Sequence, residues 1–382
     1  MVALAIGACT PVAAQDTADL GVVVERATGS VQLVDQAART SLARIQGLGD
    51  LSHASIVYSR DARYAYVFGR DGGLTKIDII AQRTVTRTVQ AGNSIGGAIS
   101  GDGRLVAVAN YEPGGIKIFD AATLELLAEI PSTYGVEGKR SKVVGIADAP
   151  GNRFVFSLFD ADEIWVADVS DARHPTIRKF QDVGRQPYDA LISPDGRYYI
   201  AGLFGEDGLV LLDMQDLDAG ARRILDGYGH GSEKLPVYKM PHLRGWAMAG
   251  DYAFLPAIGR YEVLVVDQRT WKQVAAIPVQ GQPVFVMARP DGRQVWVNFA
   301  FPRNGVVQVI DVPTLKLVET LHPGKTVLHM EFTARGNEVW ISARDDDRVV
   351  VYDTEQLRKI AELPAKSPSG IFFTWRAQKI GM

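Results

Sequence analysis

The chain repeats one short phrase along its whole length, in which β-branched and other apolar residues lead to an aspartate. Eight copies occur, and the intervals between their aspartates are 43, 42, 48, 45, 54, 44 and 42 residues. The copies are Val31–Asp35, Leu74–Asp78, Ile116–Asp120, Ile164–Asp168, Leu209–Asp213, Val263–Asp267, Val307–Asp311 and Val349–Asp353. A β-rich unit that recurs at about 40 to 45 residues is typical of the blades of a β-propeller. The sequence therefore predicts an all-β chain with eight blades.

A second phrase, a polar turn followed by a β-rich run, precedes most of these copies. Examples are Ser100–Arg104, Ser193–Arg197 and Arg289–Arg293, where Asp-Gly, in two cases after Pro, favours a tight hairpin turn. Each unit thus holds about four antiparallel strands. Only seven such phrases precede the eight aspartates. We therefore expect Ser369–Trp375 to supply the missing inner strand of the blade that begins at Leu20–Arg26, which closes the ring.

The composition excludes several classes of function. The 382 residues carry a net charge of −3, so no global positive field favours nucleic acid. The chain has one cysteine, Cys9. A disulfide within the chain, a cysteine-ligated iron–sulfur cluster, a cysteine-rich zinc site and a covalent CxxCH haem site are therefore impossible.

The first fifteen residues, MVALAIGACTPVAAQ, are small and apolar and resemble the end of an export signal. Ile6–Cys9 resembles a lipobox, in which Cys9 would be lipidated, whereas cleavage near Ala13-Ala14 would give a soluble form. We interpret residues 1–19 as an export or lipobox-like tail and residues 20–382 as the propeller. The expected location is the periplasm, with a membrane anchor through Cys9 left open.

One mouth of the predicted propeller is basic, although the whole chain is slightly acidic. The loops that lead into the inner strands, together with those that follow the second strands, contribute mainly cations, histidines and tyrosines. The residues singled out there are His53, Arg70, Lys142, Arg185, Tyr188, His242 and Arg244. Arginine binds carboxylates through charge-assisted and often bidentate hydrogen bonds, so this mouth suits a large polycarboxylate ligand.

The remaining histidines and glycines receive structural interpretations. His322 and His329 are assigned to strand ends or packing, and the glycine-rich run Gly92–Gly97 is interpreted as a turn. Asp226–Pro241, within the longest interval, is expected to form an external loop. The aspartates of the repeat are too regular to be catalytic and are expected to cap turns.

The run Leu51–Asp78, LSHASIVYSRDARYAYVFGRDGGLTKID, resembles the start of the haem d1 domain of cytochrome cd1 nitrite reductase. It is more similar still to the NirF family of haem d1 biosynthesis proteins, and the resemblance extends from about residue 20 through Ser367–Trp375. It implies that His53 takes the position of the proximal iron ligand, that Arg70 approaches the carboxylates of the macrocycle, and that Lys142 is a further basic position.

The same resemblance also shows departures. Tyr188 falls near a position where the nitrite reductases carry a distal histidine. Their second distal histidine has no clear counterpart, although His242 lies close in the sequence. Because the distal histidines supply protons for nitrite reduction, and because no CxxCH is present, the chain resembles a maker or handler of the cofactor rather than the respiratory enzyme.

The resemblance implies dehydrogenation of the propionate of dihydro-haem d1 to the acrylate of haem d1, with His53 as axial ligand or base. Tyr188 or His242 would serve the opposite face, and Arg70, Lys142, Arg185 and Arg244 would hold carboxylates. The first alternative is a non-enzymatic haem d1 carrier that delivers the cofactor to cytochrome cd1 nitrite reductase, with other assembly proteins as further partners. The second is a protein-interaction propeller with an empty channel. The sequence leaves the electron acceptor and a homodimer open.

Overall fold

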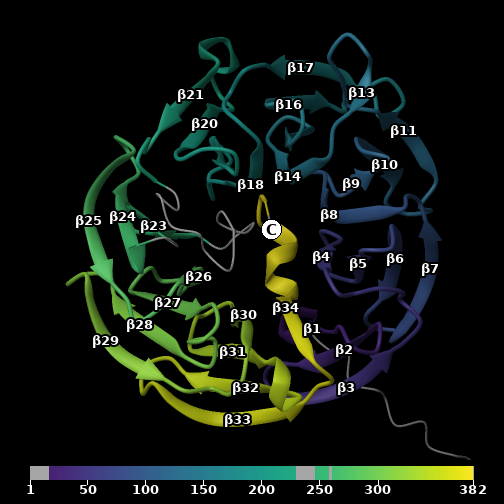
Figure 1. Cartoon of the computed structure of the whole chain (residues 1–382). Coiled ribbons are helices and arrows are strands. Elements are labelled where there is room, and N and C mark those ends of the chain that lie inside the picture. The colour runs from purple at the N-terminus through teal and green to yellow at the C-terminus, as the bar shows by residue number, and fades with distance from the viewer. Residues whose placement is uncertain (1–16, 229–245, 258–259, 382) are drawn as a thin grey trace, which may run out of the picture.

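The computed structural model describes residues 17–228, 246–257 and 260–381, which form a ring of eight antiparallel sheets around a central channel (Figure 1). Each of the eight sheets has four strands, and the order from the axis outward follows the chain in seven of them. The predicted eight-bladed β-propeller is confirmed.

The strands fall into four rings. The inner strands, which line the channel, are β34 (Pro368–Phe373), β4 (Ser55–Tyr58), β8 (Asn93–Ile99), β14 (Val143–Ala149), β18 (Pro187–Ile192), β22 (Ala247–Ala249), β26 (Pro283–Ala288) and β30 (Val327–Phe332). The second strands are β1 (Leu20–Glu25), β5 (Tyr64–Phe68), β9 (Leu105–Glu112), β15 (Arg153–Leu158), β19 (Tyr198–Leu203), β23 (Tyr252–Ala257), β27 (Gln294–Phe299) and β31 (Glu338–Ala343). The third strands are β2 (Ser30–Asp35), β6 (Gly73–Asp78), β10 (Ile116–Asp120), β16 (Glu163–Asp168), β20 (Leu209–Asp213), β24 (Glu262–Asp267), β28 (Val307–Asp311) and β32 (Arg348–Asp353). The outer strands are β3 (Thr40–Ile45), β7 (Arg83–Val89), β11 (Leu126–Ile130), β17 (Thr176–Phe180), β21 (Ala221–Ile224), β25 (Lys272–Pro278), β29 (Lys316–Leu321) and β33 (Arg358–Pro364).

The remaining elements are short and lie outside the eight four-stranded sheets. A two-stranded ribbon pairs β12 (Thr133–Tyr134) with β13 (Lys139–Arg140). The 3₁₀ turns are η1 (Thr17–Asp19), η2 (Leu217–Ala219), η4 (Arg344–Asp346) and η5 (Thr374–Gln378). In the described part of the chain, no helix has both the length and the apolar character needed to cross a membrane.

The C-terminal strand β34 closes the ring by pairing with β1, as the sequence predicts. Val22 lies opposite Phe372 and Val23 opposite Ile371, so the first and last parts of the chain share one blade. Gly21 is required at this seam, because a Cβ there would lie 2.4 Å from the ring of Phe373. Tyr58 ties the seam to the next blade, since its hydroxyl donates to the carbonyl of Phe372 at 2.6 Å.

The repeated aspartates organise the turns that follow the third strands. All eight carboxylates accept a backbone N–H within the next few residues, for example Asp267 from Thr270 at 2.7 Å and Asp353 from Gln356 at 2.7 Å. These hydrogen bonds hold the pKa of Asp267 below its usual value. The interpretation of the aspartates as turn caps is confirmed.

The core lies between neighbouring blades, where the apolar faces of successive sheets pack against each other. Trp296 and Trp340 are fully buried there, and the ring of Trp340 meets that of Phe373 edge-on at 5.4 Å.

At one end of the propeller, η5 follows β34 into the centre of the ring (Figure 1). Arg376 of η5 forms a bidentate ion pair with Glu331 of β30, with Nε 2.6 Å from Oε1, and the two side chains are only 2% and 1% exposed. Arg60 also fastens this end, because it donates to the carbonyl of Ala377 at 2.8 Å and contacts Asp148 at 3.2 Å.

We expect Arg376→Met to destabilise the protein by about 3 to 5 kcal/mol, because it leaves the Glu331 carboxylate buried without its counter-charge. The double variant Arg376→Met/Glu331→Leu should recover most of that loss. Arg173→Met, which breaks an exposed pair with Glu125, is the matched control and should cost about 1 kcal/mol or less. Chemical denaturation measures all three, and equal losses for Arg173→Met and Arg376→Met would contradict the role of the buried pair.

Candidate functional site

A cavity of about 230 Å³ opens at the end of the channel opposite η5. Its wall is built from inner strands and from the loops that lead into them, with Arg376 at its floor. The lining residues are Arg26, Ser52, His53, Ala54, Ser55, Ile56, Val57, Ile95, Gly96, Gly97, Gly145, Ile146, Tyr188, Asp189, Phe285, Leu328, His329, Ser369, Gly370, Phe372 and Arg376.

β-bulges contribute about half of the residues of this wall. The register of the inner strand shifts in six blades, on β8, β14, β18, β26, β30 and β34. On β18, for example, Tyr188 and Asp189 together oppose one residue of β19, and on β30 Leu328 and His329 oppose one residue of β31. A bulge bends the strand and re-aims its side chains, so residues that regular pairing would place elsewhere face the channel.

Polar residues of the second strands satisfy the backbone groups that these bulges release. Asn298 accepts the N–H of Phe285 at 2.8 Å, and Ser342 accepts the N–H of His329 at 2.8 Å. Tyr199 donates to the carbonyl of Gly145 at 2.8 Å from the neighbouring blade. All three of these side chains are buried, so the bulges of β14, β26 and β30 are each held by a hydrogen bond from a buried side chain.

His53 lines the cavity from the loop just before β4, as the sequence predicts. The loop is fixed on both sides of Ser52, since Asp50 accepts the N–H of Ser52 at 2.8 Å and Arg26 donates to its carbonyl at 2.5 Å. The imidazole of His53 is therefore presented by a hydrogen-bonded turn and not by a loose segment.

His329 lines the same cavity from the bulge of β30. Its Nδ1 accepts the backbone N–H of Ile371 at 3.2 Å. Its ring stacks on Phe372 with centroids 5.7 Å apart and meets the edge of Phe285 at 5.8 Å. The assignment of His329 to packing is thus incomplete, because the residue packs in a strand and also forms part of the cavity wall.

Tyr188 stands on another side of the cavity, within an aromatic group that includes Phe159 and Phe204. Its hydroxyl lies 2.9 Å from that of Tyr111. Burial raises the pKa of Tyr188, and the carboxylate of Asp189 raises it further. Burial also raises the pKa of Tyr111, as does the neighbouring Tyr188. Both phenols are therefore neutral donors or acceptors at neutral pH.

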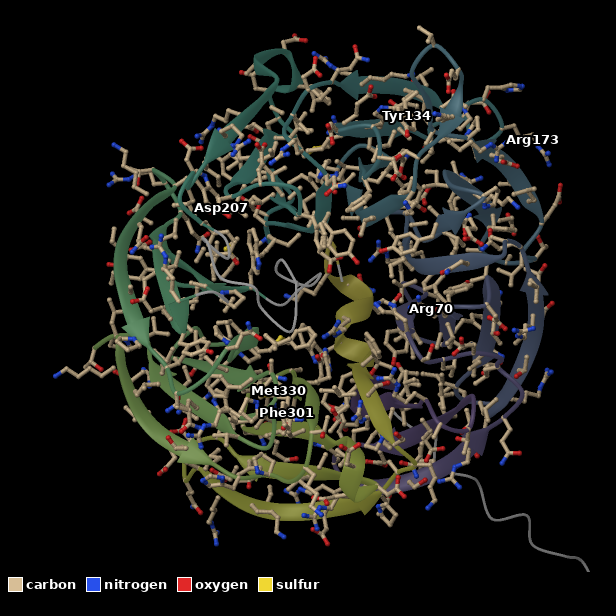
Figure 2. All side chains as sticks on the ribbon, in the orientation of Figure 1. Arg70, Tyr134, Arg173, Asp207, Phe301 and Met330 are labelled. Atoms are coloured by element: carbon tan, nitrogen blue, oxygen red, sulfur yellow. The ribbon has the colours of Figure 1, made fainter. Side chains whose placement is uncertain are left out.

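Three arginines lie at the open end. Burial lowers the pKa of Arg26, and the positive charge of Arg344 lowers it further, so these two guanidinium groups act on each other at the seam of the ring. Arg70 is exposed beside the channel (Figure 2), and its backbone N–H donates to the carbonyl of Asp50 at 2.8 Å. His53 and Arg70 therefore lie at the same end of the propeller, as the sequence predicts.

Two other predicted cations lie outside the cavity wall and face acidic partners. Lys142 Nζ is 2.9 Å from Asp160 and lies over the ring of Phe159. Arg185 is exposed, 3.7 Å from Glu206. His242 and Arg244 fall outside the described residues, as does most of the predicted external loop Asp226–Pro241, so their roles stay predictions.

Sequence reasoning missed part of the site. The assignment of Gly92–Gly97 to a turn is wrong, because Asn93–Ile99 forms the inner strand β8 and its glycines line the cavity. A Cβ on Gly97 would lie 2.3 Å from the ring of Phe68, so the bare backbone lets the blades approach closely. Arg26 and His329 were also missed. The polar residues Asn298 and Ser342 near the ends of apolar second strands are the signal that could have located the bulges.

Comparison with known proteins places this geometry in a family. The profile described as Cytochrome D1 heme domain matches residues 15–377, which is nearly the whole chain. The chain belongs to the cytochrome D1 heme domain family. The expected relationship to the haem d1 domain is thereby confirmed.

Relatives within this family include Protein NirF of Pseudomonas aeruginosa, which is 65% identical over 365 residues that cover 95% of this chain and 93% of the relative. Dihydro-heme d1 dehydrogenase of the same organism is 31% identical over 364 residues, which cover 93% of this chain and 71% of the relative. Among solved structures, dihydro-heme d1 dehydrogenase NirN in complex with DHE superimposes with a TM-score of 0.84 at 28% identity, covering 96% of this chain and 78% of the other.

We expect Ser342→Ala to destabilise this cytochrome D1 domain by about 1 to 3 kcal/mol, because it leaves the buried N–H of His329 without an acceptor. Thr314→Ala removes a hydroxyl from an exposed turn and is the matched control, which should be close to neutral. Urea denaturation compares the two variants. A neutral Ser342→Ala would show that the bulge does not depend on this hydroxyl.

Proposed function

We propose that the chain acts in haem d1 biosynthesis: it binds dihydro-haem d1 in the open cavity and dehydrogenates its propionate to the acrylate of haem d1. The observation that carries this proposal is the cavity itself, which His53 and Arg26 line. Arg344, which pairs with Asp345, acts on Arg26 electrostatically, and Arg70 is exposed beside the channel (Figure 2). The family match and the dehydrogenase relative supply the chemical class of the ligand.

The shape of the cavity is compatible with a flat macrocycle that enters from the mouth. Its volume of about 230 Å³ is below the roughly 300–1,000 Å³ of pockets that enclose drug-sized ligands, so a tetrapyrrole would extend into the wider opening. The glycines of β8, β14 and β34 leave backbone at the wall, and a Cβ on Gly96 would lie 3.0 Å from Ser55 Oγ. That buried hydroxyl has no hydrogen-bond partner among the described residues, which suits a polar group of a ligand.

The donor set also fits iron that is already held by a macrocycle. The described residues contain no group of three or more His, Cys, Asp or Glu side chains placed to bind a bare metal ion. A tetrapyrrole supplies four nitrogens itself and needs one axial ligand from the protein, for which His53 is our candidate. The axial ligand would set the potential of the iron in the substrate.

The reaction removes two hydrogens, as two protons and two electrons, from adjacent carbons of the propionate. Both hydrogens leave as protons to bases; one of the two C–H electron pairs becomes the double bond, and the other is the pair that must be passed to an acceptor. The iron of the substrate relays the two electrons to an external acceptor. The cations at the mouth bind and orient carboxylates, and Lys142 and Arg185 stay predictions for that role. Asp189 and His53 are the candidate proton acceptors at the wall, although a His53 nitrogen that ligates iron cannot also accept a proton.

The carrier function stays the second candidate, and one observation favours it. The single cysteine excludes a covalent CxxCH haem, so the described chain offers no electron relay of its own. A carrier needs the same pocket but no acceptor, and would pass haem d1 to cytochrome cd1 nitrite reductase. Export to the periplasm and an anchor through Cys9 belong to this proposal too, and Cys9 lies outside the described residues.

An anaerobic single-turnover experiment separates the two functions. Wild-type protein, dihydro-haem d1 and an excess of a one-electron acceptor such as ferricyanide should give a product lighter by two hydrogens, measured by mass spectrometry. His53→Ala should lose this conversion and shift the Soret band. Binding without conversion, followed by transfer of haem d1 to apo nitrite reductase, would support the carrier instead. An unchanged tetrapyrrole spectrum with wild-type protein would reject both.

The arginine pair at the seam should contribute to affinity in a salt-dependent way. We expect Arg26→Gln or Arg344→Gln to weaken haem d1 binding by about tenfold at low salt, because each removes a charge-assisted contact to a carboxylate. The difference from wild type should shrink as salt increases. Arg173→Gln, at an exposed site, is the control and should leave affinity unchanged. Spectral titration at two ionic strengths measures the effect, and salt-independent losses would contradict it.

A further inference from the structure

Two histidines line the cavity, and the contacts of one of them, His329, indicate its chemistry. A histidine that ligates a metal through one nitrogen usually donates a hydrogen bond from the N–H of the other nitrogen. The Nδ1 of His329 does the reverse, because it accepts the N–H of Ile371 at 3.2 Å. In a neutral ring with Nδ1 unprotonated, the proton resides on Nε2. That nitrogen then has no lone pair for iron.

The neighbours of His329 fix the position of its imidazole as well as its tautomer. Ser342 holds both backbone groups of His329, since its hydroxyl accepts the N–H at 2.8 Å and donates to the carbonyl at 3.2 Å. Phe372 stacks on the imidazole and Phe285 packs against it edge-on. A flip of the ring would face the N–H of Ile371 with a carbon, so the surroundings favour one orientation and one donor.

The charges around the cavity show which ligand group this donor suits. Asp189, the one carboxylate among the described lining residues, lies on β18, across the channel from β30 and β34 (Figure 1). Arg26 follows β1, in the blade of β34, and Arg344 follows β31, in the neighbouring blade of β30 and His329. A carboxylate of a bound macrocycle is therefore repelled from the β18 side and attracted to the seam.

We propose that His329 is not an iron ligand but a positioning residue that donates a hydrogen bond from Nε2 to a carboxylate of the bound tetrapyrrole, on the side of the cavity formed by β30 and β34. This inference rests on the proposed function. It leaves His53 as the only axial histidine among the described cavity residues, and it orients the macrocycle by one of its carboxylate arms.

Two substitutions at His329 separate the roles of its nitrogens. The amide of glutamine reaches the position of Nε2 and keeps a donor there, whereas that of asparagine reaches only the position of Nδ1. Haem d1 and its fully methyl-esterified form serve as probes, because the ester lacks the anionic acceptor. We expect His329→Asn to weaken binding of haem d1 by about tenfold or more and to leave binding of the ester nearly unchanged. His329→Gln should remain close to wild type.

The spectra provide an independent readout. The Soret band and the electron paramagnetic resonance spectrum of bound haem d1 should be the same in wild type, His329→Asn and His329→Gln, whereas His53→Ala should change both. A change of axial ligation in His329→Asn, or equal affinity losses for acid and ester, would overturn the inference and leave the proposed function standing. Failure of wild-type protein to bind haem d1 would instead reject the proposed function.

The ligand-free protein gives a test that does not depend on ligand binding. The ¹⁵N NMR spectrum of histidine-labelled wild type, assigned with His329→Gln, should show an unprotonated Nδ1 and a protonated Nε2 for this residue. A protonated Nδ1 would overturn the inference directly.

Discussion

The pairing of β34 with β1 is the interaction on which both the ring and its cavity depend. It joins the two ends of the described propeller in one sheet, so the blades cannot separate without breaking that seam. The same strand delivers the cavity-lining residues Ser369 and Gly370, the N–H of Ile371 that sets the tautomer of His329, and the ring on which that histidine stacks. Its continuation, η5, enters the centre of the ring at the far end, where Arg376 pairs with Glu331. The strand that closes the ring therefore also builds part of the cavity, so the site depends on ring closure.

The bulges explain how a repetitive scaffold produces an asymmetric site. Regular inner strands would present similar alternating side chains around the axis, with one register in every blade. Instead, six inner strands shift register at the open end, and each bulge places different residues at the wall: Tyr188 with Asp189 on one side, and His329 on the other. Buried hydrogen bonds from Asn298 and Ser342 stabilise two of the shifts. The regular strands build the scaffold, and the bulges place the residues of the cavity wall.

The sequence predicts the scaffold well because the scaffold is periodic. The eight aspartates, the turns and the closing strand follow from local patterns, and the structure confirms each of them. The sequence also predicts that His53 and Arg70 lie at one end of the propeller, because the position of a loop determines at which end its residues lie. The bulges are not periodic, and the pattern of alternation does not reveal where register shifts. His329 therefore seemed to be a packed strand residue, and Gly92–Gly97 seemed to be a turn, because both interpretations assume regular pairing.

The charges and hydrogen bonds around the cavity favour different roles for the two histidines, namely axial ligand for His53 and hydrogen-bond donor for His329. A single imidazole cannot both ligate iron and donate to a carboxylate through the same nitrogen, so a site that needs both functions requires two residues. His53 is presented by a loop that Arg26 and Asp50 fix through Ser52, on the blade next to the seam. His329 is held as a donor by a backbone N–H, which no substitution at position 371 other than proline can remove. A donor fixed by the main chain is robust to changes in neighbouring side chains, and under this proposal His53 is the axial candidate among the described cavity residues.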